Sequence, residues 1–170
     1  VVRTTLIPSL LNIYEYNKAR KVNDILIYEI AKTYDKDYEE TTKAAILMKG
    51  NYLVNPALNV NVKVDFFVLK GIIENLLDFL GYKNRYSFVK DENIDSMHPN
   101  MSARIMLDRN EIGIIGRVHP SLKKDEIYVC EINLNALLGN IKPIKYKVAS
   151  KYPSIEKDFA FIVDNNVTNK

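Results

Sequence analysis

The chain has 170 residues, of which 47% are hydrophobic, so it is long enough to bury one full core. Its net charge of only +3, with both signs mixed along the chain, gives little support to a nucleic-acid-binding arm, and the single cysteine excludes an internal disulfide framework and fits a reducing compartment. No apolar run approaches the roughly 20 residues that a membrane-spanning helix needs, and no signal peptide is visible. Because the sequence starts without Met, we expect a piece of a longer protein.

The first predicted helix follows a short extended segment. Residues 3–7 form that segment, and Pro8 stops it. Ser9 is then a suitable N-cap, with Leu10 and Tyr14 on one helical face beyond it. Basic residues follow, which suits the negative end of a helix dipole. The pattern therefore predicts a helix that begins at Ser9.

Two strands and an exposed loop are predicted next. Residues 24–31 (DILIYEIA) are dense in Ile and Tyr, which favours a buried strand. Residues 43–50 (KAAILMKG) are expected to pair with it in antiparallel fashion across a polar loop. Residues 51–62 contain Pro56 and several Asn residues, so we interpret them as an exposed loop.

The clearest helical pattern covers residues 65–80. Asp65 is a favourable N-cap, and Gly81 provides a left-handed stop. Apolar side chains recur between them at three- and four-residue steps, namely Phe66, Leu69, Ile73, Leu76, Leu77 and Leu80. A helix with such a face needs a partner layer, and a sheet is the expected one.

A β-hairpin is predicted at the centre of an antiparallel sheet. Its strands are residues 102–107 and 111–118, which are apolar and are separated by the polar turn 108–110. His-Pro pairs at 98–99 and 119–120 flank the hairpin. Proline cannot donate to a sheet ladder, so each pair is expected to end a strand.

Further strands are predicted on both sides of this hairpin. They are residues 86–90 and 126–132, and in the second one odd-numbered and even-numbered residues face opposite ways. Asn133 or Asn135 can cap a short helix after it. Residues 158–163 predict one more strand, which either joins the main sheet or begins a further domain, because a lone strand is unstable.

The spacing of Gly113 and Gly116 matches a GxxG loop that clamps nucleic acid in KH domains. The two residues between them are both Ile, which carry no charge and favour strands. We therefore interpret the motif as part of the hairpin. Phosphate-binding GxxxxGK[ST] and GxGxxG loops are absent from the sequence.

Few side chains suggest catalysis or metal binding. His98, His119 and Cys130 could supply three zinc ligands, but none are paired at short spacing. We interpret both histidines as structural or surface residues, and Cys130 as a buried, inert thiol. Glu74 and Asp78 lie one helical turn apart and are interpreted as solvated charges. Residue chemistry therefore predicts a non-catalytic α+β domain.

Five blocks of the sequence, in order, carry a family resemblance. They read VRTTLIPSLL, LIYEIAKTY, VDFFVLKGIIENLLDFLG, HPNMSARI followed by IGIIGRVHP, and YVCEINLNAL. In this order they resemble the beta chain of bacterial phenylalanine–tRNA ligase, across residues 2–164. The closing stretch SKYPSIEKDFAFIVD resembles the start of that chain's C-terminal ferredoxin-like anticodon-binding domain.

The resemblance implies an antiparallel sheet flanked by helices, like a degenerate core of class II aminoacyl-tRNA synthetases. Residues 1–147 would form this non-catalytic module, and residues 148–170 a linker and the truncated start of the next domain. Class II cores hold ATP with an arginine on a strand and a Gly-rich motif that ends in Glu-Arg. Residues 25–31 contain no Arg, and residues 129–133 contain neither Gly nor Arg. Asn100-Met101 replaces a Gly-Arg pair of the family.

We therefore expect no catalytic residue, and no cofactor or metal bound by this chain, while the whole complex uses ATP and magnesium. The resemblance implies a cytoplasmic heterotetramer, not associated with membranes, that attaches phenylalanine to tRNA(Phe). In it this module would dock the catalytic alpha chain, and other parts of the beta chain would contact the tRNA. Docking predicts an exposed apolar patch. Arg3, Thr4 and Thr5, together with the hairpin, are guesses for that interface.

Two alternative functions stay open. The first is a free-standing RNA-binding module that uses the basic cluster from Lys142 to Lys151 (KPIKYKVASK). Such a module would bind tRNA without a partner and lose affinity with salt. The second is an independent ATP-using enzyme, which the lack of phosphate-binding motifs disfavours.

Overall fold

The computed structural model describes residues 3–138, 156–160 and 162. Its main element is a six-stranded antiparallel sheet in the order β1-β2-β8-β7-β6-β5. The strands are β1 (Ile25–Tyr34), β2 (Glu40–Lys49), β5 (Tyr86–Lys90), β6 (Met97–Leu107), β7 (Asn110–Val118) and β8 (Tyr128–Asn133). The predicted α+β class, with an antiparallel sheet flanked by helices, is confirmed.

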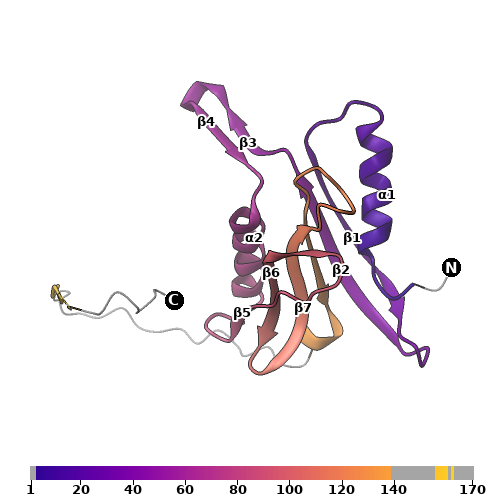
Figure 1. Cartoon of the computed structure of the whole chain (residues 1–170). Helices are drawn as coiled ribbons and strands as arrows, with labels where there is room; N and C mark the ends of the chain where they lie inside the picture. Colours follow the sequence, from indigo (N-terminus) through magenta and orange to yellow (C-terminus); the bar gives the residue numbers. More distant parts are fainter. Residues whose placement is uncertain (1–2, 139–155, 161, 163–170) are drawn as a thin grey trace.

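Two α-helices cover different parts of the sheet (Figure 1). The helix α1 (Ile7–Lys18) packs on β1 and β2, and α2 (Phe66–Phe79) packs on β7 and β8. A two-stranded hairpin, β3 (Asn51–Asn55) and β4 (Val60–Lys63), projects beyond the sheet. The 3-10 turns η1 (Pro56–Leu58) and η2 (Asn135–Leu137) complete the described elements.

The alternation of β8 divides the interior into two cores. Tyr128, Cys130 and Ile132 belong to the core under α2, which also contains Leu69, Ile73 and Leu77. Ile127 and Val129 belong to the core under α1, which also contains Leu6, Leu10 and Tyr14. The two helices therefore lie on opposite faces of the sheet, and the alternation predicted for residues 126–132 is confirmed.

The predicted start of α1 at Ser9 is wrong. The helix begins at Ile7, and Pro8 lies in its first turn. Proline is tolerated there because the first backbone N–H groups of a helix have no intrahelical acceptor. Ser9 does not cap the helix; its hydroxyl oxygen instead accepts a 2.8 Å hydrogen bond from the Arg3 guanidinium.

The prediction for α2 is confirmed at both ends. The Asp65 carboxylate accepts a 2.7 Å hydrogen bond from the Val68 N–H, as an N-cap does. Gly81 has a φ of +87°, the left-handed conformation that ends many helices.

The strand β1 pairs with β2 as predicted, but the prediction that it is buried is wrong. It lies at one end of the sheet order, and its side chains alternate between half-buried and exposed along most of its length. A high content of Ile and Tyr does not reveal whether a strand has a neighbouring strand on one side or on both. Residues 51–62 are largely exposed, as expected, but they form the β3–β4 hairpin rather than an irregular loop.

The central hairpin is confirmed with two adjustments. Its turn is shorter than predicted, because Leu107 pairs with Asn110 and Asp108 takes the left-handed conformation. The pair at 119–120 follows the last residue of β7, as predicted, whereas the pair at 98–99 lies inside β6. The β6–β7 register is interrupted between Met97 and Ser102, and such an irregularity admits a proline.

The cluster from Lys142 to Lys151 and the proposed boundary at 147/148 lie outside the described residues. Of the strand predicted at 158–163, residues 158–160 and 162 are described, and they are in no helix or strand.

Candidate functional site: the Glu131 carboxylate and the exposed face of β1

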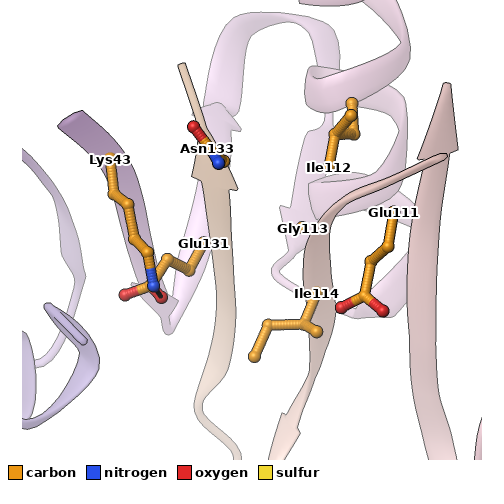
Figure 2. Close-up of a pocket in the computed structure, with 7 residues that line it drawn as sticks. All are labelled: Lys43, Glu111, Ile112, Gly113, Ile114, Glu131 and Asn133. Atoms are coloured by element: carbon orange, nitrogen blue, oxygen red, sulfur yellow. Dashed lines mark hydrogen bonds and ion pairs between the residues drawn. The ribbon is translucent and has the colours of Figure 1, made fainter. Parts of the chain in front are cut away.

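A cavity of about 270 Å³ lies on the sheet between β2, β8 and β7. Its lining residues are Lys43, Glu111, Ile112, Gly113, Ile114, Glu131 and Asn133 (Figure 2). The side chains of Lys43 and Glu131 reach toward each other from adjacent strands, as Figure 2 shows. Because Glu131 follows Ile127 and Val129 at two-residue steps, it lies on the face of β8 that carries α1.

The Glu131 carboxylate is buried, with 6% of the residue exposed, and three donors bind it. One oxygen accepts 2.7 Å hydrogen bonds from the Thr5 hydroxyl and from the Leu6 backbone N–H. The other oxygen accepts a 2.9 Å bond from the Lys43 ammonium. A buried carboxylate is stable only when donors or opposite charges replace its water, and all three donors do so here.

The N-terminal segment is fixed to the sheet through these bonds. Lys43 also donates to the Thr4 carbonyl, at 3.0 Å, so it bridges this segment and β8. Arg3 forms a 2.5 Å ion pair with Glu29 on β1. Of the three residues guessed to contact a partner, Arg3 and Thr5 thus bind within the chain, and Thr4 is exposed. Their role at an interface stays a prediction.

The other charges beside this cavity are also paired. Arg104 on β6 binds Glu111 at 2.6 Å and Asp91 at 2.5 Å. A backbone hydrogen bond from Asn93, and then the Arg104 bond, hold the pKa of Asp91 below its ordinary value. Lys43, which lines the cavity, and Arg104, which binds the lining residue Glu111, therefore both have carboxylate partners. Chemically, the arrangement fits a site that holds strands and the N-terminal segment together.

The two glycines of the GxxG motif lie mid-strand in β7, where backbone passes close to each. A Cβ on Gly113 would lie 2.2 Å from the Glu131 carbonyl oxygen, and one on Gly116 would lie 2.8 Å from the Met101 carbonyl oxygen. Such distances exclude any side chain without a shift of the backbone. The motif is part of the hairpin, as interpreted from the sequence.

The structure separates the three candidate zinc ligands. The rings of His98 and His119 lie with centroids 6.5 Å apart, whereas Cys130 is buried in the core under α2. Each histidine Nδ1 accepts a backbone N–H two residues ahead, from Asn100 and Ser121 respectively. Burial raises the pKa of the Cys130 thiol, so its interpretation as a buried thiol is confirmed. Among the described residues, no cluster of three or more His, Cys, Asp or Glu side chains could hold a metal.

The interpretation of Glu74 and Asp78 as solvated charges holds only in part. Each is only partly exposed and has a partner: Glu74 pairs with Lys70 at 2.9 Å, and Asp78 accepts a 2.9 Å bond from the Tyr86 hydroxyl. Burial, together with the nearby Asp78 carboxylate, raises the pKa of Tyr86 to about 12.

An apolar stripe on β1 was not assigned from the sequence. Leu26, Tyr28 and Ile30 alternate along the strand, and all three side chains are exposed. Their partners in register on β2 are Met48, Ile46 and Ala44. We call these three residues the β1 stripe. The spacing of apolar residues at two-residue steps was the available signal, but it did not reveal which strand lies at the edge.

The fold and this site define an antiparallel α+β module that is organised around a buried, fully bound carboxylate. A family model described as the phenylalanyl tRNA synthetase beta chain CLM domain matches residues 1–134, and the chain belongs to this family. The resemblance found in the sequence is thereby confirmed.

Curated relatives carry the same description. The phenylalanine–tRNA ligase beta subunit of Bacillus subtilis is 37% identical over 99% of this chain, and that of Listeria monocytogenes serotype 4b is 35% identical over 97%. The one from Carboxydothermus hydrogenoformans is 33% identical over 98%. This chain spans only 22% of the length of each of these relatives. No helix in the described part of the chain is long and apolar enough to cross a membrane.

Proposed function

We propose that this chain is a non-catalytic module that docks the alpha chain of phenylalanine–tRNA ligase through the β1 stripe. The observation that carries the proposal is the exposure of three apolar side chains in a row on an edge strand. Contiguous exposed apolar surface of this kind marks interaction sites in soluble proteins. The relatives are named as beta subunits, which supports a partner subunit.

The position of the stripe explains why the described part of the chain leaves it uncovered. Tyr28 pairs with Ile46, which packs against the core under α2, so the stripe lies on the same face of the sheet as α2. That helix packs on β7 and β8, whereas β1 is separated from β8 by β2. A partner that extends the layer formed by α2 would therefore cover the stripe.

The backbone of β1 supports the same proposal. The strand is 10 residues long and has no further strand beside it among the described residues. Its Tyr34 N–H donates to the Arg3 carbonyl, so the N-terminal segment protects only that end of the strand. Proteins normally protect a long apolar edge against aggregation, and a stable partner is one way to do so.

The remaining parts of the proposal, on the type of core and on the reaction of the whole complex, rest on what membership of the family implies. The module is a degenerate class II synthetase core, and the alpha chain performs the ATP- and magnesium-dependent transfer of phenylalanine to tRNA(Phe) within a heterotetramer. In the position of the Gly-rich motif, β8 carries the buried Glu131, whose bonds hold the N-terminal segment. Arg3 then supports β1, whereas Thr4 and Thr5 bind Lys43 on β2 and Glu131 on β8, and the exposed Thr4 side chain is the one available for contact.

The experiment is a binding titration of the chain with the alpha chain of the same organism. Tyr28→Glu places a charge in the middle of the β1 stripe, and Tyr38→Glu is the matched control. The two tyrosines are equally exposed, at 75% and 76%, but Tyr38 lies in the β1–β2 turn. If Tyr28 is a central contact, its loss weakens binding by about 30-fold or more, since residues at interface centres contribute roughly 2 kcal/mol or more.

Two results would contradict the proposal. One is equal binding by both variants, and the other is an absence of binding by the unaltered chain. Binding of tRNA alone that weakens with salt, combined with no binding of the alpha chain, would instead favour the RNA-binding alternative.

A further inference from the structure

A second cavity, of about 350 Å³, lies at the opposite end of the sheet from the β1 stripe. It is bounded by the first turns of α2, by β5 and by the irregular part of β6. Among its lining residues are Phe66, Phe67, Phe88, Met101, Lys70 and Lys90. We call it the aromatic cavity. It shares no lining residue with the cavity between β2, β8 and β7 that Lys43 and Glu131 line.

The irregularity in β6 shapes this cavity. Between Met97 and Ser102 the strand leaves its register with β7, and Asn100 and Met101 contribute to the cavity wall. Gly116 on β7 permits the irregularity, because the Met101 carbonyl oxygen would lie 2.8 Å from any Cβ there. A bulge of this kind redirects side chains that a regular strand would place elsewhere.

The lining combines aromatic rings with two ammonium groups. The rings of Phe66 and Phe67 meet edge to face at 5.6 Å, and the Lys70 ammonium lies 5.0 Å from the centre of the Phe88 ring. Lys90 reaches the Asn100 amide oxygen at 3.4 Å.

Each ammonium also has a carboxylate partner, at 2.9 Å for Lys70 and Glu74 and at 2.6 Å for Lys90 and Glu92. Exposed ion pairs are weak. Both lysines can therefore exchange their carboxylate for the anion of a ligand.

We propose that the aromatic cavity binds a nucleotide, either free or within single-stranded RNA. The base stacks on Phe67 and Phe88, and the phosphate is bound by Lys70 and Lys90. Stacking on aromatic rings and phosphate contacts from lysine are the two interactions that bind single-stranded nucleic acid without strong sequence preference. The cavity volume lies within the range of about 300–1,000 Å³ found for small-molecule sites.

The test is a titration of the chain with AMP and, separately, with fluorescein-labelled tetra-adenylate. The signals of the four methionine methyl groups in the NMR spectrum report the place of binding, since Met101 lines the cavity. Phe67→Ala is the test variant and Phe79→Ala its control. Both phenylalanines are exposed on α2, at 74% and 84%, but only Phe67 lines the cavity. Neither change should affect folding.

Phe67→Ala should weaken binding about fivefold or more, because stacking on one ring contributes at least that factor. Lys90→Gln should reduce the salt dependence of tetra-adenylate binding, by about 0.7 in the slope of log K against log salt. Lys32→Gln, at another exposed lysine paired with a glutamate, is its control. Tighter binding of the oligonucleotide than of AMP identifies RNA as the source of the nucleotide, and equal binding identifies the free nucleotide.

Three results would overturn the proposal: no detectable binding, equal effects of Phe67→Ala and Phe79→Ala, or a shift in methyl signals that leaves Met101 unchanged. A phenylalanine-containing peptide that binds in a Phe67-dependent way, where both nucleotides fail, would identify a peptide groove instead. None of these outcomes depends on the alpha chain, so this test is independent of the one for docking.

Discussion

Replacement of Glu131 by glutamine tests the central structural argument. Glutamine has the same shape, so it can keep the bonds from Thr5 and Leu6 if its carbonyl oxygen occupies the position of the shared carboxylate oxygen. Its NH₂ group then faces the Lys43 ammonium, and the 2.9 Å ion pair becomes a contact between two donors.

The expected cost is about 2 kcal/mol. Removal of one partner from a buried ion pair costs about 3–5 kcal/mol. The cost is smaller here because the Lys43 side chain is 24% exposed and keeps its bond to the Thr4 carbonyl. A double change, Glu131→Gln with Lys43→Met, should cost less than the sum of the single changes, by about 1–2 kcal/mol.

The assay is urea unfolding at pH 7, followed by circular dichroism. With a slope of about 2 kcal/mol per molar urea, the midpoint should fall by about 1 M. Amide hydrogen exchange at Leu6 should accelerate, because the N–H of this residue loses a charged acceptor. Glu126→Gln is the control, since Glu126 is exposed and lies 3.4 Å from its cationic partner Arg117. If Glu131→Gln costs less than about 0.5 kcal/mol, like the control, the reasoning is refuted.

Three further predictions concern other parts of the module. Gly113→Ala should destabilise the fold by about 3 kcal/mol or prevent folding, because its Cβ would meet the Glu131 carbonyl oxygen at 2.2 Å. Gly71→Ala in α2, which meets no atom within 4 Å, should raise the melting temperature instead, and the reverse order would contradict this. Asp125 accepts hydrogen bonds from Lys18 and Tyr14, and these bonds lower its pKa. A lowered pKa in the folded state adds stability above the ordinary value near 3.8, and this stability is lost as the pH falls through the folded value. Asp125→Asn should therefore be less stable than the parent at pH 7, and urea unfolding at decreasing pH should show the difference closing; a constant difference would refute the assignment. Cys130, at 1% exposure, should react with a thiol reagent only after unfolding, and a fast reaction of the folded chain would show that this core opens locally.

The elements that the sequence predicted well are those whose signal is local. Residues 65–80 repeat apolar side chains at helical spacing between an N-cap and a glycine, so α2 was predicted to within a residue. The alternation in residues 126–132 likewise identified both faces of β8. Each signal depends only on residues within the same element.

The errors concern features that other parts of the chain determine. Pro8 was interpreted as a stop because proline breaks helices, yet it is equally compatible with the first turn of α1. The exposure of β1 follows from the sheet order, which the strand's own residues do not encode. The bonds of Glu131 join residues more than 80 positions apart in the sequence. The one signal within β8 itself was a charged residue, Glu131, at the two-residue spacing that places it on the same face as Ile127 and Val129.

The buried carboxylate has a consequence for how the strands find each other. If β8 slipped by one residue against its neighbours, every side chain would change face, and Glu131 would enter the core between Leu69, Ile73 and Leu77. No donor from Thr5, Leu6 or Lys43 could follow it there, whereas the apolar residues of β8 would tolerate either face. A single charge therefore makes the slipped pairing unstable. Glu131 thus selects the native alignment of β8 with its neighbours, and it also holds the N-terminal segment.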